Sequence, residues 1–326
     1  MLMNPSDFWQ PCEETISSFD QLAEVIDEVF TKWSAKSRVF AWRGLVNAEW
    51  PLHSSLYRRV AWSQTASLPE EVDIRRHEGN ILAEFHRWGL HVSPTGARMS
   101  ILNQLAALQH HGAPTRLVDV TFNPWIGAWF AVEKKWHNGT EVHGSEDARL
   151  FAIDVTGRLI NENDAYRDWE DSLRRPWPER PSTSASSEEK GPYREWCSKV
   201  FAWRPPHYDS RISAQNGGFI FGGVPMTNGP SGQNKWPKSG NDTGFWKIAE
   251  VRADTSVALR RHKLRTVRGG VSQDAVYSFR ILHTAKREIR ERLERNFDYK
   301  HSTIYPDYTG FAEFATPTLK SKPKTD

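Results

Sequence analysis

The chain has 326 residues, and 38% of them are hydrophobic, with 15 Trp and 16 Phe, which is enough apolar material for one large core. Its 43 Lys and Arg face 40 Asp and Glu, and the resulting net charge of +3 is too small to indicate nucleic-acid binding by itself. The chain shows no apolar run as long as a membrane span, no basic-then-apolar signal at its start, and no metal-ligand spacing around its two cysteines, Cys12 and Cys197. We therefore expect a cytoplasmic protein that makes no membrane contact and has no disulfide framework and no metal centre.

The first third of the chain predicts two amphipathic helices, over 16–33 and 70–88, with a short strand between them. The strand begins at Val39 and is expected to end at Arg43-Gly44. An arginine there can present its guanidinium to a phosphate or carboxylate, and the glycine would let a ligand approach the backbone. The alternative, which the spacing alone favours, is a surface arginine before a turn.

Two serines follow, Ser54 and Ser55, and then the pair Arg58-Arg59. Serine hydroxyls in such a place usually cap a helix, so we expect capping here. The alternative is that Ser55 makes a second contact to a bound anion, in addition to the one expected at Arg43.

The central segment runs from Gln109 to Thr121 and is dense in polar side chains. A helix over 101–108 is expected to stop at Gly112, and a buried strand over 117–120 to follow. The next helix begins after Asn123, an N-cap residue followed by proline. Short loops thus hold polar groups between rigid elements, which is where sites are usually built.

The candidate site residues of this segment are two histidines, an arginine, an aspartate and a threonine. His110 and His111 lie at a helix C-terminus, where the helix dipole favours a cation, and they could also hydrogen-bond a ligand. We expect Arg116 to pair with Asp119, an arrangement that often only holds a loop. Asp119 and Thr121 are two apart on the strand, so they share one face, which we expect to line a cleft.

The second half of the chain predicts further strands and one long helix, separated by two stretches that we expect to be mobile. The strands are expected over 150–155, 217–221, 247–251 and 275–282, the helix over 284–296, a loop over 138–147, and the mobile insertions near 178–192 and 222–244. Strands and helices do not alternate regularly. We therefore expect one α+β domain with a twisted, partly antiparallel sheet flanked by helices, and a split of that sheet into two small sheets stays open.

Four segments together resemble the FRG domain family. They are Trp42-Arg43-Gly44 with Trp50, Leu52, Ser55-Leu56 and Arg58; Gln109 to Thr121 with Asn123-Pro124; Arg211 to Phe219; and Tyr305 to Gly310. The resemblance covers residues 17–315 and leaves 1–16 and 316–326 as tails. Trp42 stands where phenylalanine or tyrosine is usual in that family, and Val120 where an aromatic residue is usual. The resemblance implies a bacterial effector of defence or toxin-like context that acts on a nucleotide, a nucleic acid or a phage component.

A more distant resemblance is to ADP-ribosyltransferases of the Arg-Ser-Glu type. It implies that Arg43 binds a phosphate or ribose of NAD, that Thr121 positions the nicotinamide ribose, and that Gln215 orients the ribose hydroxyls. Cleavage of the nicotinamide bond builds positive charge on the ribose, which a carboxylate usually stabilises. Gln215 is neutral, so either Asp119 supplies that charge or the protein binds NAD without turning it over.

The sequence therefore predicts NAD-dependent ADP-ribosyl transfer or NAD hydrolysis, with NAD as the cofactor. The catalytic candidates are Arg43, Asp119, Thr121 and Gln215, and the candidate cofactor contacts are Arg43, Gly44, Ser55, His110, His111 and Arg116. One alternative is a nucleic-acid-binding or -modifying effector that uses the arginines near 58–59, 174–175, 260–268 and 287–295, although interleaved acids favour a solvated face for the last of these. Another is a non-catalytic sensor of a phage component. The sequence leaves the oligomeric state open.

Overall fold

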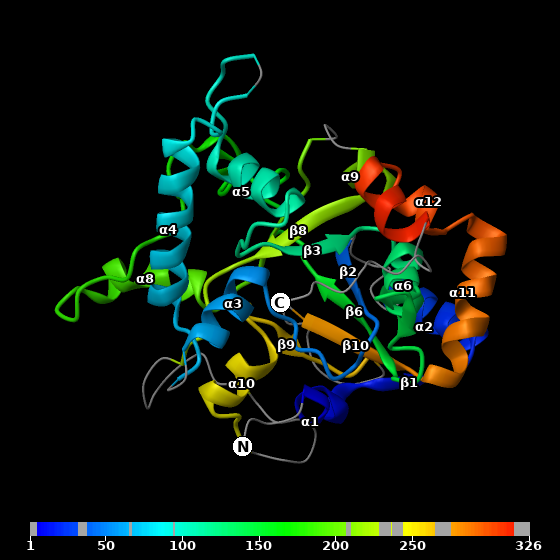
Figure 1. Cartoon of the computed structure of the whole chain (residues 1–326). Coiled ribbons are helices and arrows are strands. Elements are labelled where there is room, and N and C mark those ends of the chain that lie inside the picture. The colour runs from blue at the N-terminus through cyan, green and yellow to red at the C-terminus, as the bar shows by residue number, and fades with distance from the viewer. Residues whose placement is uncertain are drawn as a thin grey trace.

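A mixed β-sheet forms the centre of the molecule, with helices on both faces (Figure 1). The computed structural model describes residues 5–31, 38–64, 67–93, 95–206, 210–227, 236, 244–264 and 275–315. Within this part of the chain the sheet has eight strands in the order β1-β10-β6-β2-β3-β8-β7, with β9 beside β10. The strands are β1 (Glu14–Ile16), β2 (Phe40–Leu45), β3 (Val118–Thr121), β6 (Ala148–Asp154), β7 (Phe201–Trp203), β8 (Gly217–Phe221), β9 (Arg260–Arg261) and β10 (Ala275–Ile281).

The pairing of the strands confirms a partly antiparallel sheet in one α+β domain. β1 and β9 run parallel to β10, and the other neighbours in the sheet are antiparallel. The eight strands of the main sheet are continuous and do not split into two small sheets, but β2 and β3 are joined by a single residue pair. Only Trp42 and Thr121 pair there. The strands β4 (Lys135–His137) and β5 (Thr140–Val142) form a separate hairpin inside the region that was expected to be a loop.

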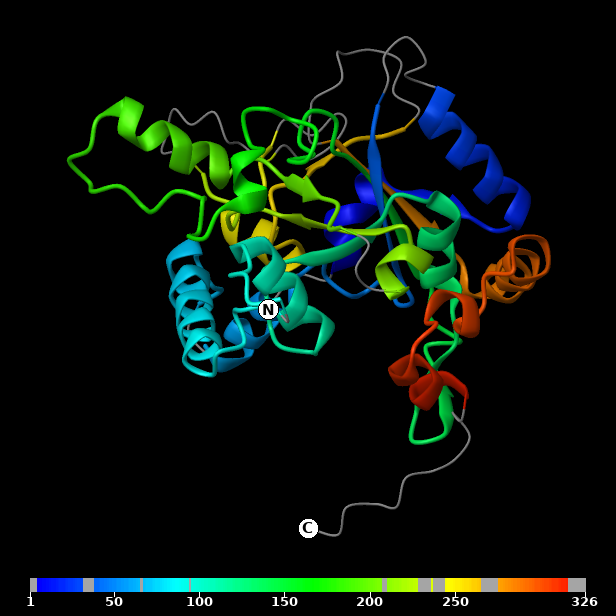
Figure 2. The same ribbon diagram turned by 90° about the horizontal axis from the view of Figure 1, so that it is seen from above.

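Three groups of helices cover the sheet, as the two views show (Figures 1 and 2). One face packs against α2 (Phe19–Thr31), α6 (Pro124–Val132) and α11 (His283–Phe297). The other face packs against α1 (Pro5–Trp9) and α10 (Ile248–Asp254). Around the β8–β7 end lie α3 (Ser55–Ser63), α4 (Glu71–Arg87), α5 (Ile101–His110) and α8 (Ser187–Trp196). Short helical turns complete the chain: η1 (Gln10–Cys12), α7 (Asp168–Asp171), α9 (Ser210–Ala214), α12 (His301–Ile304), α13 (Tyr308–Gly310) and η2 (Phe311–Ala315).

The helix α6 packs directly against the strand β2 at Gly44. A Cβ at this position would lie 2.2 Å from the carbonyl oxygen of Gly127 and 2.4 Å from the amide nitrogen of Ala131, both on α6. The glycine therefore lets α6 lie directly on β2. The helix thus takes the space on the Cβ side of Gly44, although Gly44 also lines the cavity described below.

Several expected elements differ from the structure in extent or type. β2 continues through Gly44 to Leu45, so Arg43 lies inside a strand and not at its end. The strand expected over 247–251 is the helix α10, where Ile248 and Val251, three apart, share the side that packs on the core. Residues 5–16, expected to be a tail, contribute α1 and β1 to the fold, and the tail expected over 316–326 lies outside the described residues.

The buried face of α4 also differs from the expected one. The spacing of apolar residues over 70–88 would place Val72 and Trp88 on the buried face, but their exposed fractions are 46% and 73%. The helix instead buries a stripe made of Glu71, Ile74, Glu78 and Leu82. Two buried glutamates in that stripe require a cation nearby, which the pattern of apolar residues alone does not reveal.

Of the two insertions that were expected to be mobile, 178–192 is fully described by the structure and 222–244 only in part. α8 begins at Ser187, inside the stretch 178–192, and a capping box between Ser186 and Glu189 starts it. Its buried residues, Tyr193 and Trp196, lie just beyond that stretch. Most of 222–244 lies outside the described residues. None of the described helices combines the length and the apolar character that crossing a membrane requires.

Candidate functional site

A cavity of about 1170 Å³ opens where β2 and β3 separate. Trp42 and Thr121 form the one residue pair between these strands. Next to it, a side chain and not the backbone of β2 contacts β3: Arg43 Nη1 donates to the carbonyl oxygen of Asp119 at 3.0 Å. Further walls come from α3, α9, Tyr305 and the segments 49–53 and 133–135. The cavity therefore lies at the weakest junction of the sheet, and side chains from both halves of the chain line it.

Two guanidinium groups and one carboxylate dominate the charge at this junction. Arg43 Nη1 is 3.7 Å from Asp119 Oδ2, and Arg58 Nη1 donates to the carbonyl oxygen of His53 at 2.7 Å. Burial and then the nearby charge of Arg43 lower the pKa of Arg58, and Asp119 opposes this only in part. An anion bound between the two arginines would relieve this repulsion.

The carboxylate of Asp119 is held from one side and open on the other. Gln109 Nε2 donates to Asp119 Oδ1 at 2.7 Å, and Gln109 Oε1 accepts a hydrogen bond from the hydroxyl of Thr115. The side chain of Asp119 nevertheless keeps an exposed fraction of 59%. Gln109 was not among the residues expected to form the site, although it is the first residue of the central segment.

Thr121 and Gln215 line the cavity as expected, but much of their hydrogen-bonding capacity is used inside the fold. The hydroxyl of Thr121 donates to the Gln215 carbonyl oxygen at 2.7 Å and accepts from the amide of Asn123 at 3.0 Å. The side-chain amide of Gln215 donates to the carbonyl oxygen of Ile304 at 3.0 Å. The two residues thus join β3, α9 and α12 at the floor of the site.

Of the three expected contacts Ser55, His110 and His111, only His110 lines the cavity. His110 is exposed and lines the cavity, whereas His111 is exposed at the C-cap of α5 and lies outside the described lining. The hydroxyl of Ser55 accepts from the amide of Thr115 at 3.0 Å and donates to its carbonyl oxygen at 3.3 Å, which fastens the loop to α3. Ser54 caps α3 by accepting from the amide of Tyr57, as expected for one of the serines.

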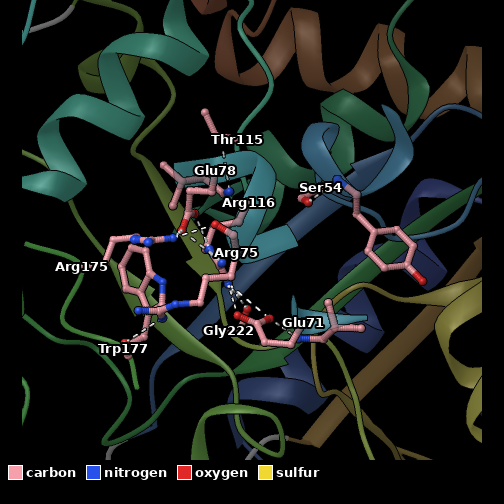
Figure 3. A network of polar contacts seen from close by, with 12 residues as sticks. Ser54, Glu71, Arg75, Glu78, Thr115, Arg116, Arg175, Trp177 and Gly222 are labelled. Atoms are coloured by element: carbon pink, nitrogen blue, oxygen red, sulfur yellow. Dashed lines mark hydrogen bonds and ion pairs between the residues drawn. The ribbon is translucent and has the colours of Figure 1, made fainter. Parts of the chain in front are cut away.

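Arg116 lies away from the cavity, in a buried network drawn in Figure 3. Its exposed fraction is 3%, and its Nη1 donates to Glu71 at 3.1 Å and to the carbonyl oxygen of Gly222 at 3.2 Å. Its Nη2 donates to Glu78 at 3.1 Å. The expected pairing of Arg116 with Asp119 was wrong, because α4 brings two glutamates to the guanidinium.

Two tryptophans enclose the same guanidinium. Its central carbon lies 5.0 Å from the ring centroid of Trp177 and 5.2 Å from that of Trp196, and the two rings stack on one another. The indole of Trp196 also donates to Glu71 at 3.0 Å. This environment makes Arg116 a structural residue of the interior and leaves it no access to a ligand in the cavity.

The far wall of the cavity holds a second charged cluster that the sequence did not indicate. Glu133 forms an ion pair with Lys135 at 2.8 Å and accepts from the hydroxyl of Tyr305 at 3.3 Å. Burial and the charge of Glu133 raise the pKa of Tyr305 well above its ordinary value. The side chain of Glu133 is only 3% exposed, so its carboxylate is enclosed by its partners.

One histidine of the wall is fixed in its neutral form. Burial lowers the pKa of His53 to about 3, against an opposing hydrogen bond from its ring to the carbonyl oxygen of Arg252. His53 therefore does not serve as an acid–base group near neutral pH. Two aromatic side chains complete the lining, Trp50 and Trp62, with exposed fractions of 39% and 76%.

Neither a metal site nor an unpaired run of arginines on α11 is present in the part of the chain that the structure describes. No group of three or more His, Cys, Asp or Glu there is arranged to hold a metal ion. On α11, Arg287 pairs with Glu291 at 3.7 Å and Arg292 approaches Glu288 at 3.9 Å. These arginines face acids of their own helix, and 265–268 lies outside the described residues. Cys12 and Cys197 are both buried free thiols.

Comparison with known proteins gives one match, to a family model. Residues 38–139 match the FRG domain, whereas no curated protein and no solved structure matches the chain. The matched segment carries Arg43, Arg58, Gln109 and Asp119, while Gln215 and Tyr305 lie beyond it. The FRG segment of this chain is thus the part that builds the charged wall of the cavity.

Proposed function

We propose that the cavity binds NAD or a closely related nucleotide and that the protein cleaves the bond between nicotinamide and ribose. The observation that carries this proposal is the pair Arg43 and Arg58, which share one cavity and whose mutual repulsion is only partly offset by Asp119. Guanidinium groups match phosphate oxygens in charge and in hydrogen-bond geometry. A diphosphate between them would supply the missing negative charge.

The size and lining of the cavity support a ligand of this kind. Its volume of about 1170 Å³ slightly exceeds the usual range for small-ligand pockets, about 300–1,000 Å³, as a dinucleotide would need. Trp50 and Trp62 offer aromatic faces on which a base can stack. The proposal therefore places the phosphates at the arginine pair and a base at the tryptophans.

Of the carboxylates in the wall, Asp119 is the one suited to the chemistry. Three line the cavity: Glu49, Asp119 and Glu133. Glu133 is enclosed, and Glu49 lies 3.4 Å from Arg280, whereas Asp119 is the most exposed of the three. When the C–N bond breaks, its electron pair leaves with nicotinamide, and the positive charge that remains on the ribose would be stabilised by Asp119.

The capture step completes the reaction. The oxygen of water or of an acceptor hydroxyl bonds to the ribose carbon and releases its proton to solvent. Thr121 and Gln215, whose polar groups bond within the fold, would hold β3 and α9 in place and not touch the ribose. This changes the role that the sequence suggested for them while keeping them essential to the shape of the site.

The test is incubation of the purified protein with NAD, with nicotinamide release and any mass shift of added protein or nucleic acid as readouts. R43A is the test variant, and R287A is the matched control because its side chain is 83% exposed on α11. Release that is lost in R43A and kept in R287A is the expected result. Binding of NAD without release would reject the cleavage step and leave a nucleotide sensor. A folded protein that neither binds nor cleaves NAD would reject the proposal.

A further inference from the structure

The open carboxylate of Asp119 is fixed in direction by a relay that crosses four elements. The amide of Thr115 donates to Ser55 on α3, the hydroxyl of Thr115 donates to Gln109 on α5, and Gln109 donates to Asp119 on β3. On its other side, Asp119 faces Arg43 of β2 at 3.7 Å. Each member of the relay uses one atom toward the next.

The relay settles which way the side-chain amide of Gln109 points. A hydroxyl donates to its oxygen, so its nitrogen is the atom that remains for Asp119. This nitrogen engages Oδ1 only, and the approach of Arg43 to Oδ2 is longer than a hydrogen bond. A carboxylate has about four lone-pair positions. Asp119 therefore keeps acceptor capacity that points into the cavity.

We propose that Gln109 and Asp119 form a subsite for the vicinal hydroxyls of a ribose, next to a phosphate held by Arg43 and Arg58. Two neighbouring hydroxyls can donate to one carboxylate, which is how acidic side chains recognise the ribose of nucleotide cofactors. The subsite selects ribonucleotides over 2′-deoxyribonucleotides. It rests on the proposed function, because the phosphate must be held at the arginines for the sugar to reach Asp119.

In this subsite Gln109 is a positioning residue. Loss of its hydrogen bond frees Asp119 to rotate toward Arg43, where the two charges would form a closer ion pair. The carboxylate would then be less available to the sugar, while Arg58 would still hold the phosphate. The ratio of two affinities therefore reports on Gln109 in a way that a loss of folding would not.

The experiment compares the binding of adenosine 5′-monophosphate and its 2′-deoxy analogue to the full chain by titration calorimetry. We expect the ribonucleotide to bind at least about tenfold more tightly, because a hydrogen bond to a charged group is lost in the analogue. D119A should abolish the difference. D164A is the matched control, since that carboxylate is 91% exposed and lies outside the cavity lining.

A second variant separates positioning from simple structural support. Q109M keeps the length of the side chain and loses both hydrogen bonds. Its ribose preference should shrink several-fold while its affinity for the 2′-deoxy analogue stays near that of the unaltered protein. A fall of both affinities by the same factor would overturn the positioning role.

The outcomes also distinguish this inference from the proposed function. Equal affinities for the two nucleotides, both weakened in R43A, would overturn the ribose subsite and leave the phosphate site standing. Failure of the folded protein to bind either nucleotide or NAD would overturn both.

Discussion

Two arginines with similar prospects in the sequence have opposite surroundings in the structure. Arg43 and Arg116 both stand in polar motifs of the FRG segment, and both were expected to contact a cofactor. Arg116 is 3% exposed and meets two glutamates and two tryptophan rings. The side chain of Arg43 is 29% exposed, and the only carboxylate that pairs with it among the described residues, that of Asp119, lies at 3.7 Å. The arginine that can bind a ligand is therefore the one whose charge is not fully balanced by nearby carboxylates.

The electrostatics of the two regions follow the same division. Burial alone would lower the pKa of Arg116, but Glu71 and Glu78 outweigh it and leave the pKa raised, so the group stays charged in the interior. In the cavity, burial and the repulsion from Arg43 lower the pKa of Arg58. The charge of Arg116 is balanced by Glu71 and Glu78 within the fold. The repulsion between Arg43 and Arg58 is offset only in part, so a bound anion would stabilise the cavity.

The strongest way to break the comparison is to remove the buried cation. R116M should destabilise the protein by about 3–5 kcal/mol, because Glu71 and Glu78 would remain buried without their partner. Chemical denaturation followed by tryptophan fluorescence measures this. A loss below about 1 kcal/mol would show that water or Arg175, 3.7 Å from Glu78, compensates for the missing charge.

A smaller but still large effect is expected where the sheet supports the cavity. The added methyl of G44A would meet the backbone of α6 at 2.2 Å, so the helix must shift. Overpacking of this kind costs about 1–3 kcal/mol, and here we expect the upper end. The measurement is thermal unfolding, with G191A as the control, since nothing lies within 4 Å of a Cβ at that position. Equal melting temperatures for the two variants would contradict the close packing.

A buried charge without partners should behave differently from both arginines. Neither carboxyl oxygen of Asp254 has a hydrogen-bond partner among the described residues, and burial raises its pKa from 3.8 to about 7. Between about pH 4 and pH 7 the folded state keeps a proton that the unfolded state has lost, so stability falls as the pH rises through this window.

The variant D254N removes this titration. It should be more stable than the unaltered protein at pH 8 by about 1–3 kcal/mol, and the two should converge toward pH 4. Urea unfolding at a series of pH values measures the difference. A constant gap across the series would mean that the carboxyl group is not the source of the pH dependence.

The smallest effect on stability is expected at the open arginine. R43A should change the free energy of unfolding by less than about 1 kcal/mol, because a partly exposed pair at 3.7 Å contributes little. The same variant should weaken nucleotide binding by about tenfold or more. Denaturation and calorimetry on one preparation measure both. A large loss of stability with unchanged binding would reverse the assignment of the two arginines.

Much of the fold follows from local patterns in the sequence. The N-cap at Asn123 accepts from the amides of Trp125 and Ile126, and Gly112 has the positive φ expected of a residue that ends a helix. The extents of α4, β8 and α11 agree with the expected ones to within one residue or exactly, because their signals lie within a few neighbouring residues.

The candidate site was only partly predictable. Arg43, Asp119, Thr121 and Gln215 do meet in one cavity, although β2, β3 and α9 are far apart in the sequence. The order of strands and the separation of β2 from β3 depend on packing between distant segments, and no local pattern specifies them. The enclosed cluster around Glu133 and the relay through Gln109 were missed for the same reason.

The sequence by itself determined where α4 and α11 begin and end, where α6 begins, and that the polar residues of the central segment would lie between rigid elements joined by short loops. Only the tertiary structure decided which arginine is structural and which is open to a ligand. The helix α4 brings Glu71 and Glu78 to Arg116, but no described element brings a second acid to Arg43. The charge state and reach of a side chain depend on partners supplied by distant segments, and burial fixes those partners only when the whole chain has packed.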